Sequence, residues 1–129
     1  MGVAMDLGFG WYFLSLHGRI SRQEFWLGQG LIGVLLLLLA VKAAFALPAS
    51  IIDAVVFWPV VAIAVKRLHD LDMSGWWVGM SLAMCAVSAT VNDCSLSFLF
   101  ATTEVLAGLP SGTRGANRFG ADPLAASLA

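Results

Sequence analysis

Charged residues and cysteines are both scarce in this chain of 129 residues. Only 12% of the residues are charged, and seven lysines and arginines against eight acidic residues leave a net charge of −1. Because there is no positive excess to attract a polyanion, we expect no nucleic-acid partner. The two cysteines, Cys85 and Cys94, lie in or beside apolar runs, which is typical of small buried thiols. A disulfide or a metal site would need more ligands or an oxidising compartment, so neither is expected.

The sequence also lacks a nucleotide-binding fingerprint. The glycine-rich stretch GTRGANRFG, residues 112–120, follows an apolar run and has no GK[ST] ending, so it is neither a Walker motif nor a dinucleotide fingerprint. Its glycines suit tight turns, and Asn117 tolerates a left-handed backbone. We therefore expect no cofactor, and we interpret this stretch as a tail that Asn117, Arg118 and Asp122 fix to other polar loops.

What the chain has in abundance is apolar sequence. Apolar residues make up 60% of it, and its mean hydropathy of +0.88 is too high for a soluble domain of this size. Between Phe25 and Val41 no side chain is ionisable. About 20 such residues in a helix cross a hydrocarbon layer of about 30 Å. Three further apolar runs follow, at residues 51–65, 76–91 and 94–109.

These runs predict an all-α membrane protein that forms one multi-pass domain over residues 1–129. We expect four short transmembrane helices, at about 22–46, 51–69, 75–91 and 94–109. The alternative is three helices, the last of them long and broken at Asn92-Asp93. Aromatic residues near the start favour the membrane interface, so residues 1–18 are expected to lie along the surface. Residues 110–129 are rich in glycine, proline and small side chains and are predicted to form a loop-like tail.

The first predicted helix has a recognisable start. Ser21 and Glu24 have the spacing of a capping box ahead of an apolar run. In that arrangement the serine hydroxyl accepts a hydrogen bond from the Glu24 amide, and the Glu24 carboxylate accepts one from the Ser21 amide.

Basic residues in the polar segments predict the orientation of the chain. Six of them flank the apolar runs: Arg19, Arg22, Lys66, Arg67, Arg114 and Arg118. Basic residues concentrate on the cytoplasmic side of a membrane. Four helices would place all six there, together with the N-terminus, whereas three would export Arg114 and Arg118. The charge rule therefore favours four helices, and it brings three polar segments, 18–24, 66–74 and 112–123, to one face.

The three polar segments also carry a family pattern. GRISRQEFW, KRLHDLDMSGWW and GTRGANRFGADP occur in this order between apolar runs, and they resemble the small bacterial inner-membrane proteins grouped as domain of unknown function 805. That family's pattern reads roughly GRxxRxEFW, RRLHDxxxSGWW and GxxGxNxYGxDP. The chain departs from it at Lys66, where arginine is usual, and at Phe119, where tyrosine is frequent. The resemblance implies a multi-pass protein of the bacterial plasma (inner) membrane, and it implies no established activity.

Eight polar residues of these segments are candidates for contact with anionic lipid headgroups or with a partner protein: Arg19, Arg22, Lys66, Arg67, His69, Asp70, Asn117 and Arg118. His69 and Asp70 could also form an acid–base pair, but neighbours on a helix point about 100° apart. We favour a structural interpretation, in which His69 caps the end of its helix or bonds a carbonyl of the next loop, and Asp70 neutralises Lys66 or Arg67. Glu104, a lone charge within the last apolar run, is expected to pair with Lys66 or Arg67, because an intramembrane acid seldom remains unpaired.

The sequence favours a non-enzymatic binding or scaffold protein of the lipid bilayer, with a cytoplasmic face that contacts anionic lipid or a partner protein, which includes a second copy of the chain. The reason is that its polar residues gather at the interface and not along a transmembrane path. Two alternatives remain open. One is a small oligomeric transporter or channel subunit that uses Glu104, and the other is a headgroup-modifying enzyme that uses His69 and Asp70.

Overall fold

The computed structural model describes residues 8–43, 49–91, 102 and 104–126, and all regular structure within these ranges is helical apart from one isolated bridge between Asn117 and Gly120. The all-α class is thereby confirmed for the described residues. The expected break at Asn92-Asp93, the first part of the fourth helix and Cys94 lie outside them, as does the side chain of Cys85.

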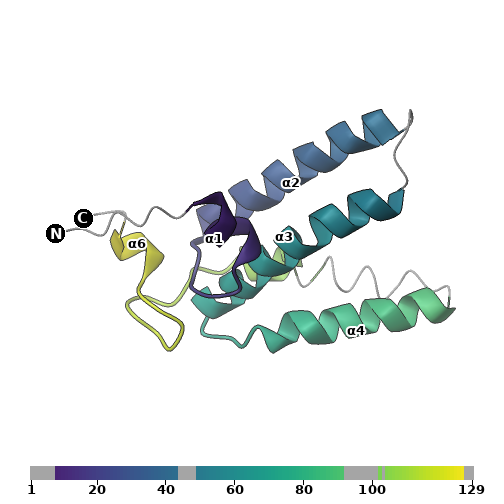
Figure 1. Cartoon of the computed structure of the whole chain (residues 1–129). Helices are drawn as coiled ribbons and strands as arrows, with labels where there is room; N and C mark the ends of the chain where they lie inside the picture. The colour runs from purple at the N-terminus through teal and green to yellow at the C-terminus, as the bar shows by residue number, and fades with distance from the viewer. Residues whose placement is uncertain (1–7, 44–48, 92–101, 103, 127–129) are drawn as a thin grey trace.

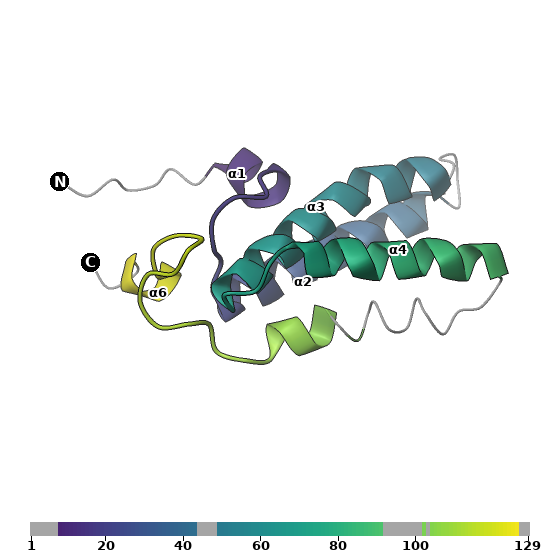
Figure 2. The same ribbon diagram turned by 90° about the horizontal axis from the view of Figure 1, so that it is seen from below.

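Three long helices form the body of the molecule. They are α2 (Arg22–Ala43), α3 (Ala49–Asp70) and α4 (Trp76–Val91). The short helix α1 (Phe9–Leu14) precedes them, residues 104–108 are also helical, and α6 (Pro123–Ala126) follows. Figure 1 shows α2 and α3 running antiparallel, with α4 returning beside α3, and Figure 2 shows residues 104–108 beside α4. Helices α1 and α6, at the two ends of the described chain, lie at the end of the bundle where α2 begins and α3 ends.

Helix α2 begins at the predicted capping box. The Ser21 amide donates to a Glu24 carboxylate oxygen at 2.7 Å, and the Glu24 amide donates to the Ser21 hydroxyl at 3.3 Å. Two of the amides that a helix start leaves without partners are satisfied in this way. The prediction from the Ser21–Glu24 spacing is therefore confirmed, and it fixes the direction in which the preceding polar segment enters the bundle.

Helix α3 is central, because α1, α2 and α4 all pack against it. The cluster between α1, α2 and α3 contains Phe13, Phe25 and Ile63, all buried. Gly28 allows this close packing: a Cβ atom there would come within 2.6 Å of the Tyr12 hydroxyl and 2.8 Å of Ile63 Cδ1. A second cluster joins α3 to α4 through buried valines and leucines such as Val65.

Helix α3 ends in a Schellman motif, which sets the turn that follows. Asp72 adopts a left-handed backbone with φ of 58°. The Met73 amide donates to the Leu68 carbonyl at 2.8 Å, and the Asp72 amide donates to the His69 carbonyl at 3.1 Å. These bonds satisfy carbonyls at the helix end and turn the chain toward α4.

The outward sides of the helices are apolar. On α2, Leu27 is 73% exposed and Leu31 and Leu37 are exposed as well, and on α4 the side chains of Met80 and Met84 are exposed. Contiguous exposed apolar surface of this extent is unusual for a soluble monomer. Among the helices in the described ranges, none combines the length and the apolar character needed to cross a membrane.

The tail is more ordered than the predicted loop. Asp122 caps the single turn of α6, because its carboxylate accepts from the Leu124 amide at 2.9 Å, and Pro123 occupies the first helical position. The same carboxylate accepts from the Gly115 amide at 2.8 Å, which closes the glycine-rich stretch on itself. These two amide hydrogen bonds lower the pKa of the Asp122 carboxyl below its usual value.

Candidate functional site

The polar end of the bundle, formed by residues 18–24, 66–74 and 112–123, is organised around Asp70. This last residue of α3 is 2% exposed. Arg19 donates to its Oδ1 from Nε at 3.1 Å and from Nη2 at 2.9 Å, while Arg67 donates from Nη1 to its Oδ2. Two buried guanidiniums thus share one buried carboxylate, and the cluster of three side chains keeps one positive charge in excess.

Backbone carbonyls accept the remaining donors of the two arginines. Arg19 donates to the carbonyls of Thr113 at 2.7 Å and Gly115 at 2.8 Å, and Arg67 donates to those of Ala107 at 3.0 Å and Pro110. A buried charge is tolerated only when such partners are provided. Because the carbonyls belong to residues 107–115, the arginines fix the path of the chain into the tail.

The tail in turn donates hydrogen bonds to backbone carbonyls at the end of α3. Thr113 donates to the Asp70 carbonyl twice, from its amide at 2.8 Å and from its hydroxyl at 2.9 Å, and the Asn117 side chain donates to the His69 carbonyl at 2.8 Å. Residue 112 must be glycine at this approach, because a Cβ atom would overlap the Asp70 carboxylate. The interpretation of the tail as a segment fixed to other polar segments is confirmed for Asn117 and for Arg118, which donates to the Asp72 carbonyl at 2.8 Å. Asp122 instead bonds within the tail.

His69 has a structural environment. Its Nδ1 lies 3.2 Å from the Gly18 carbonyl, and its ring stacks on Phe119 with centroids 4.0 Å apart and planes 6° from parallel. Burial, and to a lesser extent the nearby His17 and Arg118, lower the pKa of His69 below its usual value. Because a carbonyl oxygen can only accept a hydrogen bond, Nδ1 is the donor in the contact with Gly18. The carbonyl partner was expected in the loop that follows α3, whereas the structure shows it in Gly18, ahead of α2, and the arginines bind Asp70.

Lys66 is fully buried and does not reach the surface of the polar end. Its ammonium group donates to the Trp11 carbonyl at 2.7 Å and to the Tyr12 carbonyl, and it lies 4.4 Å from the centre of the Trp11 ring. Of the two cations that were expected to neutralise Asp70, Arg67 is the one that does so. Lys66 instead attaches α1 to α3.

Three arginines remain exposed at this end. Arg118 pairs with Asp72 at 3.2 Å, with the side chains 61% and 48% exposed. Arg22 donates to the Leu109 carbonyl at 3.2 Å and is otherwise open to solvent. Arg114 is exposed, and within the described part of the chain no carboxylate forms an ion pair with it.

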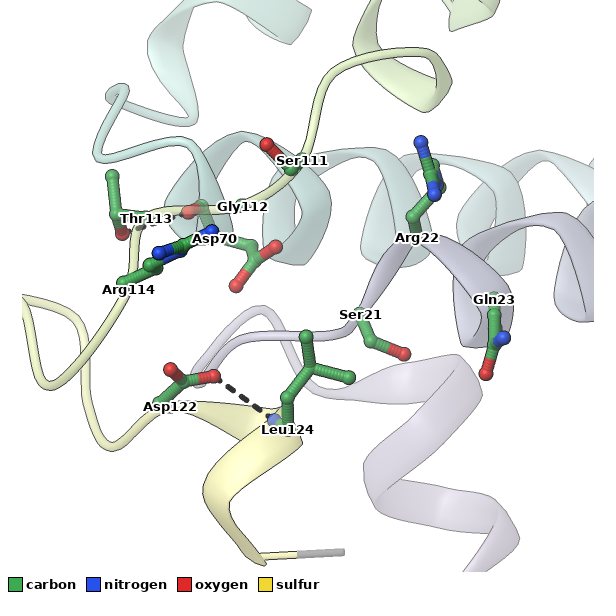
Figure 3. Close-up of a pocket in the computed structure, with 10 residues that line it drawn as sticks. All are labelled: Ser21, Arg22, Gln23, Asp70, Ser111, Gly112, Thr113, Arg114, Asp122 and Leu124. Atoms are coloured by element: carbon green, nitrogen blue, oxygen red, sulfur yellow. Dashed lines mark hydrogen bonds between the residues drawn. The ribbon is translucent and has the colours of Figure 1, made fainter.

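A cavity of about 270 Å³ opens between the start of α2 and the tail (Figure 3). Its polar lining includes two of these exposed arginines, three hydroxyl groups and one carboxylate: Arg22, Arg114, Ser21, Ser111, Thr113 and Asp122. Asp70 also reaches its wall. Figure 3 shows Arg114 and Arg22 at opposite sides, one contributed by the tail and the other by α2.

The three segments that meet at the polar end are the ones that carry the family pattern. A sequence model of the family described as protein of unknown function, DUF805, matches residues 13–121, which include the first two segments and the third as far as residue 121. The chain belongs to the DUF805 family. The resemblance of its three motifs is thereby confirmed.

Curated relatives of this DUF805 protein come from Escherichia coli strain K12. Inner membrane protein YhaI is 29% identical over 116 residues, covering 86% of this chain and 87% of its own. Uncharacterized protein YiiR is 30% identical over 128 residues, with 87% of each chain covered. Inner membrane protein YhaH is 28% identical over 120 residues, covering 86% of this chain and 88% of its own. No solved structure matches the chain.

Glu104 does not pair with a cation of the described chain, although the sequence had led us to expect one. Its Oε2 accepts from Gln29 Nε2 of α2 at 2.8 Å, and neither Lys66 nor Arg67 pairs with it. The expectation of a cation was wrong because both cations are held by other groups. Glu104 also borders an apolar cavity of about 270 Å³ between α3, α4 and residues 104–108.

Sequence reasoning missed three residues that the DUF805 site uses: Gly112, Thr113 and Arg114. All three belong to the stretch that was singled out for its glycines, and the signal that marks them is Gly112 directly before two polar residues. Such a glycine permits close approach of the backbone to a buried group. Among the described residues, no three histidines, cysteines or acids are grouped so as to hold a metal ion.

Proposed function

We propose that this DUF805 protein crosses the inner membrane several times and binds anionic lipid headgroups at a cytoplasmic polar end. One observation carries the proposal: the cations of that end fall into two sets. Arg19 and Arg67 are buried around Asp70 and hold the structure together, whereas Arg22, Arg114 and Arg118 are exposed at the same end. Exposed cations at the membrane surface attract anionic lipid, each contributing about 1 kcal/mol.

The membrane part of the proposal is supported by the relatives and by the exposed side chains. Two of the relatives are named inner membrane proteins. Large apolar side chains such as Leu27, Leu37 and Met80 face outward along the helices, where lipid would cover them. The support comes from the apolar surface of the bundle as a whole, not from the length of any one helix.

The proposed orientation in the membrane rests on the three polar segments lying at one end of the bundle. Helix α2 begins at the polar end, α3 ends there, and the tail lies there too (Figure 1). An even number of crossings would satisfy this arrangement, so we retain the four predicted ones, with the N-terminus and tail cytoplasmic because basic residues favour that side. Under this proposal the second crossing uses the apolar residues 51–65, and Lys66–Asp70 extend beyond the hydrocarbon layer.

The site favours binding over catalysis because its reactive groups are engaged. The Asp70 carboxylate is bound by two arginines, and the His69 ring is bonded to Gly18 and stacked on Phe119. A general acid or base must reach a substrate proton, and these contacts occupy both candidates. The exposed guanidinium groups have free donors, which suit a phosphate oxygen.

Two measurements test the proposal. A fluorescent reporter that folds only in the cytoplasm, fused after Ala129, is expected to fluoresce in cells, while an alkaline phosphatase fusion at the same position is expected to be inactive. Lipids that copurify with the protein in mild detergent are expected to be enriched in phosphatidylglycerol or cardiolipin relative to the total membrane. An active phosphatase fusion would overturn the orientation. A copurified lipid profile equal to that of the membrane would overturn the preference for anionic lipid.

A further inference from the structure

We infer that the cavity between Arg22 and Arg114 is a binding site for a phosphate group, supplied by an anionic phospholipid headgroup. This inference deepens the proposed function and rests on it, because it assigns the headgroup contact to one site and to two arginines. Arg114 was not among the candidates that the sequence suggested. A free phosphate ester shares the chemistry, and the experiment below distinguishes the two sources.

The charge around the cavity favours an anion. Two carboxylates line it, but Asp70 is neutralised by two buried guanidiniums and Asp122 accepts from two backbone amides. Arg22 and Arg114 add two positive charges that no carboxylate of the described chain pairs with. Arg19 and Arg67 lie behind the wall and neutralise Asp70, so the exposed charges of the lining are the two cations Arg22 and Arg114 against the carboxylate of Asp122.

The donors around the cavity suit phosphate oxygens. Arg22 uses one donor on the Leu109 carbonyl at 3.2 Å, and a guanidinium has five. The Ser21 hydroxyl accepts from the Glu24 amide and still has its own proton to donate. Thr113 is not available in this way, because its hydroxyl already donates to the Asp70 carbonyl. Arginine donors on two sides and a hydroxyl suit the two non-bridging oxygens of a phosphodiester, because each oxygen can accept more than one hydrogen bond.

The position of the cavity favours a lipid over a soluble ligand. Arg22 precedes Trp26 by one turn of α2, a rise of about 6 Å. The Trp26 indole donates to the Gly108 carbonyl at 3.1 Å while its ring is 42% exposed, and Leu27 beside it is 73% exposed. Tryptophan marks the level of the headgroups, and exposed leucine marks the start of the acyl region. The cavity therefore lies where the phosphate of a phospholipid would be, with acyl chains along α2.

The test measures the stabilisation of detergent-purified, full-length protein by added lipid. Titration with short-chain phosphatidylglycerol is expected to raise the melting temperature of the wild-type protein, whereas phosphatidylcholine raises it less. Arg22→Gln and Arg114→Gln are each expected to raise the half-saturating concentration about fivefold, and the double variant more. Arg118→Gln is the matched control, because Arg118 is exposed on the same tail but pairs with Asp72 and does not line the cavity, and it is expected to weaken binding less than either cavity variant does.

A second variant leaves both arginines in place. Gln23 lines the cavity from the exposed first turn of α2, and Gln23→Glu adds a negative charge without removing a contact. It is expected to weaken phosphatidylglycerol binding, so the inference does not depend on how well the arginine variants fold.

The outcomes separate the cavity from the broader function. Equal losses for Arg118→Gln and Arg22→Gln, or full binding by the Gln23→Glu variant, would overturn the cavity while leaving lipid binding at the polar end in place. No stabilisation of the wild type by phosphatidylglycerol would overturn both. Stabilisation by inorganic phosphate at the same concentrations, lost in Arg22→Gln and Arg114→Gln, would support the phosphate site and overturn the assignment to lipid.

Discussion

Arg19 donates two hydrogen bonds to a single oxygen of Asp70, across 51 residues of sequence, at 3.1 Å from Nε and 2.9 Å from Nη2. The contact joins the segment before α2 to the end of α3. A guanidinium held in this way is rigid, because each donor has a fixed direction. The first and second motifs of the family are thus joined directly, and the third is joined to both through Thr113.

Replacing Asp70 with asparagine removes the charge that the two buried guanidiniums share. Removing one partner of a buried ion pair costs about 3–5 kcal/mol, and we expect a loss of that size in the free energy of unfolding. Asp72→Asn is the matched control, because its pair with Arg118 is exposed and should contribute about 0–1 kcal/mol. Denaturant unfolding in detergent, followed by circular dichroism, measures both. Equal losses would contradict the buried role of Asp70.

Gly112→Ala places a methyl group where the Asp70 carboxylate lies. We expect it to separate the tail from α3 and to destabilise the protein about as much as Asp70→Asn does. Gly30→Ala is the control, because a Cβ atom there meets nothing within 4 Å and alanine is favoured over glycine in a helix by about 1 kcal/mol. Thermal melting of the two variants is the measurement. A Gly112→Ala protein as stable as the wild type would show that the tail can move away at no cost.

The His69 environment predicts a pH dependence. Burial lowers the pKa of His69 in the folded protein below the usual value of 6.5. As the pH falls, the unfolded chain therefore binds a proton at His69 before the folded chain does. The contribution of neutral His69 to the stability of the fold is complete above pH 6.5, and it is lost as the pH falls through the lower pKa of the folded protein. Melting temperatures between pH 8 and 5 are expected to fall for the wild type and for His17→Gln. His69→Gln should reduce the fall, and an unchanged fall in that variant would assign the effect to other groups.

Lys66→Met should release α1 from α3 while the rest of the bundle persists. The ammonium group binds two α1 carbonyls, and leaving buried acceptors unsatisfied costs about 1–3 kcal/mol. Hydrogen–deuterium exchange of the amides in α1 is expected to accelerate, while that of α2 changes little. Arg118→Gln, which removes an exposed cation, serves as the control. Uniform acceleration over all helices would mean that Lys66 supports the whole bundle.

Local patterns predicted the parts of this structure that depend on neighbours in sequence. The capping box of Ser21 and Glu24 is present because its two hydrogen bonds involve residues three apart. The all-α class followed from long apolar runs in the same way. The described part of α2 runs to Ala43, and the predicted end of this helix at residue 46 lies outside the described residues.

The roles of the cations could not be predicted, because a carbonyl partner leaves no mark in the sequence. Arg19 and Arg67 were candidates for the surface, yet both bind backbone oxygens of residues 107–115. Every residue has a carbonyl, so spacing alone does not indicate which of them a buried arginine meets. Glu104 was expected to pair with a cation because the two charges are opposite. In the structure its carboxylate instead accepts a hydrogen bond from the neutral amide of Gln29.

The glycine-rich stretch that closes over Asp70 leaves the ribosome only after the three long helices that it joins. Until residues 112–117 emerge, Arg19 lacks its carbonyl acceptors there and the end of α3 lacks Thr113 and Asn117. The helices can be synthesised before this point, but the group of charges that joins them stays incomplete. Assembly of the polar end therefore follows synthesis of the helices, and a nascent chain that stops before residue 112 leaves Arg19 without its carbonyl acceptors in Thr113 and Gly115.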